Sequence, residues 1–295
     1  MSTIILGGSG FLGPQILKKY PDIISVGRTK PASAVHHVDC PSIEHLSKVL
    51  DTLEFDKVIM MIGSSNHTIL NEQKPYHLEA IDKNLIPLTK ILSYFQQRPI
   101  KKLISFSSIL LYDRDQMILP VDETQPLRPY QNNYIFSKYL GEQVANFYSE
   151  IPNIIVRLTN IYGPTTALNR PDLVNQLVEG LVFNKKARVL NLKPQRDFIY
   201  TEDASDAIVK LLYTDYTGPV NVASGQINSV ADVVRILEDE SKIKIELGDG
   251  PATGHMKFVA DISLIKKLTG WEPKFDLDTG LRETYRKMCE MYHLN

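Results

Sequence analysis

Residues 5–13 read ILGGSGFLG and place Gly7, Gly10 and Gly13 at the spacing G-x-x-G-x-x-G, directly after a short apolar run. Small residues at this spacing let the backbone turn tightly, approach a pyrophosphate and pack the following helix on the strand. The helix N-terminus adds free N–H groups and a partial positive charge, and Pro14 suits its first turn. The stretch predicts a dinucleotide-binding loop, although an ordinary glycine-rich turn stays the alternative. The residues expected at the cofactor are Gly7, Gly10, Phe11, Leu12 and Gly13.

The N-terminal half alternates short apolar runs with longer amphipathic stretches. Continuous runs rich in β-branched residues predict strands buried on both faces, at 3–6, 23–26, 57–63, 102–108 and 153–159. Helix-like segments lie between them, at 11–20, 42–53, 77–97 and 134–149. This βαβα order predicts an α/β fold with a doubly wound parallel sheet of the Rossmann type.

The alternation loosens after residue 163. The segment 163–173 is rich in turn residues, 189–213 mixes short strands with a helix, and 229–242 and 277–292 look helical. We expect a dinucleotide-binding domain over 1–162, with later segments at about 189–225 interleaved into it. Residues 163–295 are expected to form mainly a smaller substrate-binding region at the edge of the sheet where ligands bind. Trp271 is interpreted as packing for this C-terminal region.

Composition narrows the class of protein. Among 295 residues, 43% are hydrophobic and 23% charged, which is ordinary for a soluble globular protein. The 33 basic and 34 acidic side chains contain no basic block, so we expect no nucleic-acid or membrane partner. No apolar run approaches the ~18 residues of a membrane span and no signal peptide is indicated, which predicts a cytoplasmic protein. Cys40 and Cys289 show no metal-binding spacing, and reduced thiols are favoured over a disulfide.

The end of the second predicted strand indicates the choice of dinucleotide. An acidic residue there would hold the adenosine 2′-hydroxyl, whereas a basic one would accept a 2′-phosphate. Residues 25–30 read SVGRTK, so Arg28 favours NADP(H). NAD(H) stays possible, because Arg28 and Lys30 could be solvated loop cations. Asp39, after a third predicted strand, is placed to meet the adenine amino group, or alternatively caps the helix beginning near Ser42.

A tyrosine and a lysine in the segment 134–149 form a candidate catalytic pair. Of the 14 tyrosines, only Tyr134 has a lysine four positions later, Lys138, which places both on one helical face. Reduction of a carbonyl needs a proton donor, and a nearby ammonium lowers the high pKa of a phenol. Ser107 and Ser108 end a predicted strand at the ligand-facing edge and could hold the substrate oxygen, or merely cap a turn. The glycine loop, the serines and the tyrosine–lysine pair occur in the chain order expected for a catalytic site. This order favours a catalytic role more strongly than any one motif does alone.

Together these motifs resemble an extended short-chain dehydrogenase/reductase of the NAD(P)-dependent nucleotide-sugar epimerase/dehydratase/reductase family. The resemblance runs nearly end to end and rests on GGSGFLG (7–13), VIMMIG (58–63), NLIPLTKIL (84–92), SFSSILLY (105–112), YIFSKYLGE (134–142), VRLTNIYGP (156–164), RDFIYTEDASDAI (196–208), VNVASG (220–225) and LTGWEPKFDLDTGL (268–281).

The resemblance implies a role for several residues and a partner. Ser108, four residues before Tyr112, is the catalytic hydroxyl beside Tyr134 and Lys138. A nucleotide sugar is the implied substrate, with Asn160 at its diphosphate. A homodimer through the helices at 77–97 and 134–149 is expected by analogy.

For Arg196 the resemblance implies contact with the substrate's nucleotide phosphates. Its chemistry agrees, because a guanidinium forks onto phosphate oxygens. A salt bridge to Asp197 or Asp203 is the alternative.

Departures from the family pattern narrow the reaction. The family's dehydratases carry Asp-Glu directly after the catalytic hydroxyl, where this chain has Ile109 and Leu110. Its two-step reductive epimerases need a cysteine at the position of Ile109. Its epimerases usually retain NAD and carry an acidic residue where Arg28 stands.

The expected function is therefore NADPH-dependent reduction of the 4-keto group of a nucleotide-activated 6-deoxysugar, with Tyr134 as the general acid, serving sugar biosynthesis. An NAD-dependent nucleotide-sugar C4 epimerase is the alternative, because it would use the same three residues. A dinucleotide-sensing binding protein would not need Ser108, Tyr134 and Lys138 together.

Overall fold

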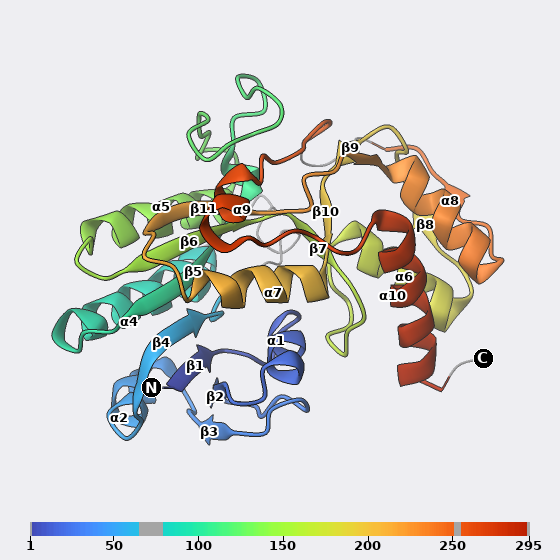
Figure 1. Cartoon of the computed structure of the whole chain (residues 1–295). Coiled ribbons are helices and arrows are strands. Elements are labelled where there is room, and N and C mark those ends of the chain that lie inside the picture. The colour runs from blue at the N-terminus through green and yellow to red at the C-terminus, as the bar shows by residue number, and fades with distance from the viewer. Residues whose placement is uncertain (1, 65–78, 251–254, 294–295) are drawn as a thin grey trace.

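The computed structural model describes residues 2–64, 79–250 and 255–293, and it contains a twisted sheet with helices on both faces and a smaller lobe beside it (Figure 1). Among these residues, no helix has the length and apolar content needed to cross a bilayer.

The central sheet is parallel throughout its described strands. In space the order is β11-β6-β5-β4-β1-β2-β3, so the chain winds outward from β1 in both directions. This order confirms the predicted doubly wound α/β sheet of the Rossmann type. The strands are β1 (Ser2–Leu6), β2 (Ile24–Gly27), β3 (His37–Asp39), β4 (Phe55–Met60), β5 (Lys102–Ser108), β6 (Asn153–Leu158) and β11 (Gly218–Val222).

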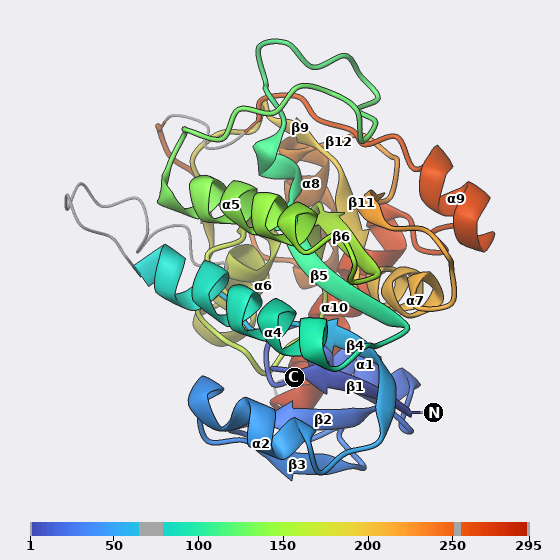
Figure 2. The ribbon, with the colours of Figure 1, turned by 90° about the vertical axis from the view of Figure 1, so that its left-hand side faces the viewer.

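Two groups of helices cover the two faces of the sheet. Figure 2 shows α4 and α5 side by side over one face, while α7 lies on the other. Strands between two helical layers lose both faces to the core, which explains why Ile4, Ile5 and Leu6 of β1 are fully buried. One face carries α1 (Gly13–Lys19), α7 (Thr201–Leu211) and α9 (Ser263–Thr269). The other carries α2 (Leu46–Leu50), α4 (Ile86–Gln97) and α5 (Asn133–Phe147).

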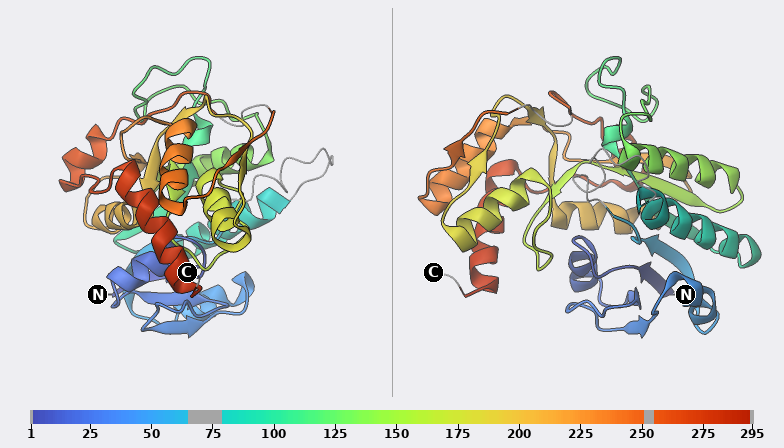
Figure 3. Two further views of the ribbon diagram at one scale, coloured as in Figure 1. Left: turned by 90° about the vertical axis from the view of Figure 1, so that its right-hand side faces the viewer. Right: turned by 180° about the vertical axis from the view of Figure 1, so that it is seen from behind.

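The smaller lobe has its own apolar core and stands beside the sheet (Figure 3). Its helices are α6 (Leu173–Asn184), α8 (Val230–Ser241) and α10 (Leu277–Met291). Short strand pairs lie around it: β7 (Asn160–Tyr162) with β10 (Phe198–Tyr200), β9 (Gln195–Arg196) with β12 (Asn228–Ser229), and β8 (Arg188–Val189) with β13 (Glu246–Leu247).

Later segments return to the sheet. Strand β11 pairs with β6, and α7 packs on the sheet's face, so residues far from the N-terminus complete the Rossmann layer. Trp271 is 1% exposed and packs in the core beneath α7 and α9. Trp271 therefore packs in the core beside the sheet rather than in the core of the smaller lobe. The predicted domain boundaries at 1–162 and 163–295 stay a prediction.

Several predicted elements differ in length. The segment 42–53 forms a 3₁₀ turn, η1 (Ile43–His45), followed by the short α2, and β4 ends at Met60 rather than residue 63. The helix predicted at 77–97 starts outside the described residues and includes a π-helical turn, η2 (Ile81–Leu85), before α4. Helices α6 and α9 were not predicted. The turn-rich segment before α6 hid the first turn of that helix. The homodimer expected through α4 and α5 stays a prediction.

A buried ion pair joins α5 to β6. Arg157 and Glu142 are 4% and 5% exposed, and the guanidinium donates to both carboxylate oxygens, Nε to Oε1 at 3.0 Å and Nη2 to Oε2 at 2.8 Å. Arg157 Nη1 also donates to the Tyr112 hydroxyl at 3.0 Å, and that hydroxyl donates to Asn221 Oδ1 at 2.7 Å. The network therefore extends from α5 through β6 to β11.

Glu142→Gln should destabilise the protein by about 3 to 5 kcal/mol, because it leaves the Arg157 guanidinium buried without its counter-charge. Urea unfolding of purified protein measures the free energy. Glu246→Gln is the matched control, since its pair with Lys186 is exposed and should contribute about 0 to 1 kcal/mol. Equal losses in the two variants would contradict the assignment.

Candidate active site

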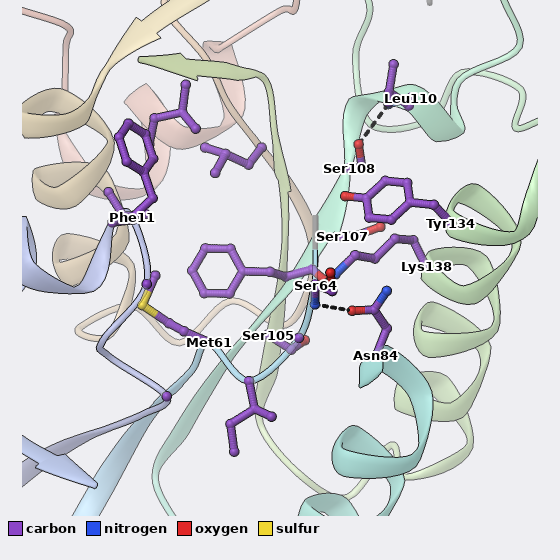
Figure 4. Close-up of a pocket in the computed structure, with 18 of the residues that line it drawn as sticks. Phe11, Met61, Ser64, Asn84, Ser105, Ser107, Ser108, Leu110, Tyr134 and Lys138 are labelled. Atoms are coloured by element: carbon purple, nitrogen blue, oxygen red, sulfur yellow. Dashed lines mark hydrogen bonds between the residues drawn. The ribbon is translucent and has the colours of Figure 1, made fainter. Parts of the chain in front are cut away.

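A cavity of ≈ 330 Å³ opens at the carboxyl edge of the sheet. Its walls come from the loop after β1, the ends of β4, β5 and β6, and one face of α5 (Figure 4). The chain reverses its winding direction between β1 and β4, and open α/β sheets bind ligands at this point.

The glycine loop after β1 forms one wall. Gly7 has φ +77°, and a Cβ there would lie 3.0 Å from Ile62. A Cβ on Gly13 would lie 2.1 Å from the carbonyl oxygen of Gly8, so close packing of α1 requires this glycine. Gly10 lines the cavity, and a Cβ there would meet nothing within 4 Å. Packing does not explain Gly10, whereas close approach of a pyrophosphate does, and the loop therefore fits a dinucleotide.

Helix α5 and strand β5 bring the predicted catalytic residues together. The Asn132 side chain caps α5 by accepting from Ile135 N at 2.9 Å, which starts the helix just before Tyr134. The Tyr134 hydroxyl is hydrogen-bonded with Ser108 at the end of β5. Lys138 follows one turn later, with Nζ 5.7 Å from the centroid of the Tyr134 ring. Figure 4 shows the three side chains on one side of the cavity, with Phe11 across from them.

Burial shifts both titrating groups of this set. It raises the pKa of Tyr134 to about 12, against the opposing effect of the hydrogen bond with Ser108. It lowers the pKa of Lys138 to about 8, while Lys138 Nζ donates to the carbonyl oxygen of Phe106 at 3.1 Å. At neutral pH Tyr134 is a protonated phenol and Lys138 is an ammonium near its titration point. The site holds a proton donor beside a hydroxyl and a cation, which is the equipment for proton transfer to a carbonyl oxygen.

Asn84, on the π-helical turn η2, ties two walls of the cavity together. Its Oδ1 accepts from Ser64 N at 2.7 Å, and its Nδ2 donates to Ser137 Oγ at 3.1 Å. Ser137 Oγ in turn donates to the carbonyl oxygen of Tyr134 at 2.7 Å. The side chain thus links the segment after β4 to the first turn of α5.

Of the twelve predicted site residues, nine line this cavity and three do not. Asn160 lines it, with Nδ2 donating to the carbonyl oxygen of Asp197 at 2.9 Å. Arg28 and Asp39 are exposed at the ends of the neighbouring strands β2 and β3, outside the lining. Arg196 lies on β9, also outside the lining. The expected roles of these residues stay predictions.

The contacts around Asp39 and Asp197 bear on the alternative roles of Asp39 and Arg196. The Asp39 carboxylate lies 3.2 Å from His37 Nε2, and Ser42 is the N-cap residue of η1, so Asp39 does not cap that turn. The carboxylate of Asp197, a candidate partner of Arg196, accepts from the backbone N–H groups of Ser224 and Gly225.

The sequence analysis missed a short lining segment before α6. Arg170, Pro171 and Asp172 reach the cavity from this side. The Asp172 side chain caps α6 by accepting from Asn175 N at 3.2 Å. An aspartate directly before an apolar helical run is a helix-start signal, and it could have indicated α6.

Three known proteins illustrate what this chain resembles in sequence and in structure. GDP-L-fucose synthase of Sinorhizobium fredii is 26% identical over 95% of this chain and 93% of that protein. UDP-glucuronic acid decarboxylase 3 of Arabidopsis thaliana is 30% identical over 95% of this chain and 87% of that protein. The crystal structure of UDP-glucose 4-epimerase from Thermotoga maritima with UDP-glucose has a TM-score of 0.89 at 19% identity, covering 99% of this chain and 100% of that one.

The family follows from the extent of the match as well as from its motifs. A sequence profile of the NAD dependent epimerase/dehydratase family matches residues 3–223, which is most of the chain. The same residues hold the glycine loop, Ser108, Tyr134 and Lys138. The chain therefore belongs to the NAD-dependent epimerase/dehydratase family of extended short-chain dehydrogenases/reductases, as its motifs predicted.

Proposed function

We propose that the protein reduces the 4-keto group of a nucleotide-activated 6-deoxysugar with NADPH. The observation that carries this proposal is the buried Tyr134, which lines the cavity beside the glycine loop together with Ser108 and Lys138. A reduction starts from a general acid, and Tyr134 is in its acid form at neutral pH.

Each side chain has a separate task in this reaction. When bound, the reduced dinucleotide supplies the hydride to the carbonyl carbon. Negative charge develops on the carbonyl oxygen, and Tyr134 donates its proton to that oxygen while Ser108 holds it by a hydrogen bond. The Lys138 ammonium stabilises the phenolate that Tyr134 becomes, because an opposite charge nearby favours the ionised form. Asn160 and Arg196 would bind the diphosphate of the sugar nucleotide.

The walls next to Ser108 support reduction over dehydration. Ile109 and Leu110, in the 3₁₀ turn η3 (Ile109–Leu111), line the cavity where the family's dehydratases carry their acid and base. An aliphatic side chain cannot transfer a proton, so elimination of water has no second acid–base pair at this place.

The edge of the sheet supports NADPH as the dinucleotide. Arg28 follows β2 and is exposed, and among the described residues no hydrogen bond or ion pair engages its guanidinium. Its place at the end of the second strand suits a 2′-phosphate. Asp39 follows at the end of β3, since Gly27 and Asp39 are partners in the strand register, and it is proposed to meet the adenine.

A C4 epimerase with retained NAD is the second candidate. The likeness to the Thermotoga maritima UDP-glucose 4-epimerase favours it, whereas the match to GDP-L-fucose synthase covers nearly the whole chain as well. The two candidates differ in what the purified protein contains. An epimerase would keep a bound dinucleotide through gel filtration, while the reductase would depend on added NADPH.

Tyr134→Phe should lower turnover by about 10²- to 10⁴-fold, because it removes the proton donor and leaves the ring in place. Oxidation of NADPH would be followed with a panel of dTDP-, GDP-, CDP- and UDP-linked 4-keto-6-deoxysugars, with mass spectrometry of the products. Tyr139→Phe, on the same helix, is the matched control and should retain turnover. Near-normal turnover by Tyr134→Phe would refute the mechanism.

The rate of reduction should be flat at neutral pH and fall as pH rises through about 8. The sign follows from Lys138: its charged form is present below its lowered pKa and is lost above it, while Tyr134 stays protonated to about 12. A pH profile of kcat measures this limb. In Lys138→Arg the guanidinium stays charged, so any remaining decrease in kcat should occur at higher pH. Activity that rises with pH would instead indicate a phenolate acting as base.

Arg28→Asp should raise the KM for NADPH by roughly tenfold to a hundredfold and lower the KM for NADH, since the charge-assisted contact to the 2′-phosphate is replaced by repulsion. Steady-state kinetics with both dinucleotides measure the ratio. Lys30→Asp makes the same charge change two residues away and should alter the ratio less. An unchanged ratio in Arg28→Asp would remove the basis for NADP preference.

A further inference from the structure

The Arg170 guanidinium lies over the ring of Phe11, a residue of the glycine loop. Its Cζ lies 4.1 Å from the centroid of the Phe11 ring, and Phe11 belongs to the loop itself. Arg170 Nε donates to Asp172 Oδ2 at 2.9 Å, while the other oxygen of Asp172 caps α6. Two independent contacts, one on the face of the guanidinium and one at Nε, therefore fix its orientation.

The remaining donors of Arg170 are available to a ligand. Among the described residues, none accepts a hydrogen bond from its Nη1 or Nη2 atoms. The side chain is 18% exposed and lines the cavity with Gly10 and Gly13. Of the described residues in that lining, Lys138 is the other cation, and its Nζ is engaged with Phe106 at the catalytic end. The guanidinium lies over the Phe11 ring, and its planar fork of N–H groups suits bidentate binding of phosphate oxygens.

We propose that Arg170 binds the pyrophosphate of the nicotinamide dinucleotide through Nη1 and Nη2 while it rests on Phe11. The contact would join α6 and the lobe behind it to the cofactor. This inference rests on dinucleotide binding, which family membership supports, and not on the direction of the reaction proposed above.

The dinucleotide is favoured over the other diphosphate that the site would hold, that of the sugar nucleotide. The ring beneath the guanidinium lies between Gly10 and Gly13, at the loop whose shape fits the dinucleotide pyrophosphate. A second contact joins α1, which follows the loop, to the chain that leads to Arg170, since Gln15 Nε2 donates to the carbonyl oxygen of Pro164 at 3.2 Å. The donors are thus positioned before the ligand arrives, which lowers the entropy cost of binding.

Direct binding tests the inference without turnover. Dissociation constants for NADPH, NADH, ADP, adenosine, UDP and GDP would be measured by calorimetry on the wild type, Arg170→Ala and Arg170→Lys. Arg170→Ala should weaken NADPH, NADH and ADP by about tenfold or more and leave adenosine unchanged, because adenosine has no phosphate. Arg170→Lys should give an intermediate loss, since it keeps the charge without the planar fork. The wild type should also lose more NADH affinity with added salt than Arg170→Ala.

Two further arms separate this role from the alternatives. Arg235→Ala, at an exposed position of α8, is the matched control and should change no affinity. Phe11→Leu combined with Arg170→Ala should weaken NADH less than the sum of the single losses, because the ring acts through the guanidinium. An equal loss for adenosine would assign Arg170 a purely structural role and overturn the proposal. A loss confined to UDP and GDP would overturn it in favour of the substrate's diphosphate. Absence of ketoreductase activity would refute the proposed function. The affinities for the dinucleotides could still be measured and would still test the role of Arg170.

Discussion

The buried pair between Arg157 and Glu142 is the interaction on which the active site depends. Two charges removed from water are costly unless their geometry is good and their remaining polar atoms are satisfied. Here both carboxylate oxygens receive a guanidinium donor, and Arg157 also reaches Tyr112. The pair fixes the position of α5 relative to β6. If the helix slid along the strand, a buried charge would lose its partner. Helix α5, which carries the predicted catalytic pair, is thus positioned by two residues outside the cavity lining.

The same helical face carries the chemistry one and two turns away. Tyr134, Lys138 and Glu142 recur at four-residue intervals, so they form one stripe that runs from the cavity into the core. Burial along this stripe raises the pKa of Tyr134 and lowers that of Lys138. At the buried end the carboxylate is balanced by a full counter-charge, whereas at the cavity end the shifts leave a neutral acid and a cation close to losing its proton. Packing of α5 therefore holds the site rigid and also sets the protonation states of Tyr134 and Lys138.

The parts that could be predicted from the sequence are those that local spacing encodes. Gly7 and Gly13 indicated their loop because a tight turn and close packing admit few other residues, Gly10 because a pyrophosphate needs close approach, and the continuous apolar runs indicated the parallel sheet. Tyr134 and Lys138 needed only the helical period. Where contacts join distant segments, the pattern was silent: Trp271 was assigned to the wrong core, and the approach of Arg170 to Phe11 depends on how α6 packs. Helix α6 was missed because its start signal, Asp172, stands among turn residues.

These long-range contacts suggest where the selectivity of the site arises. Asp197 is buried between the sheet and the smaller lobe, where its carboxylate accepts from Ser224, Gly225 and Ala260. Its backbone carbonyl orients the Asn160 amide at the cavity wall. Selectivity between related sugar nucleotides requires polar groups held in place before binding, because an unpaired buried donor or acceptor is what rejects the wrong ligand. The segments that join the two lobes provide such groups, while helix α5 carries Tyr134, the proposed general acid. For the proposed reaction, changes in these joining segments would therefore alter which nucleotide sugar is accepted without disturbing proton transfer at Tyr134.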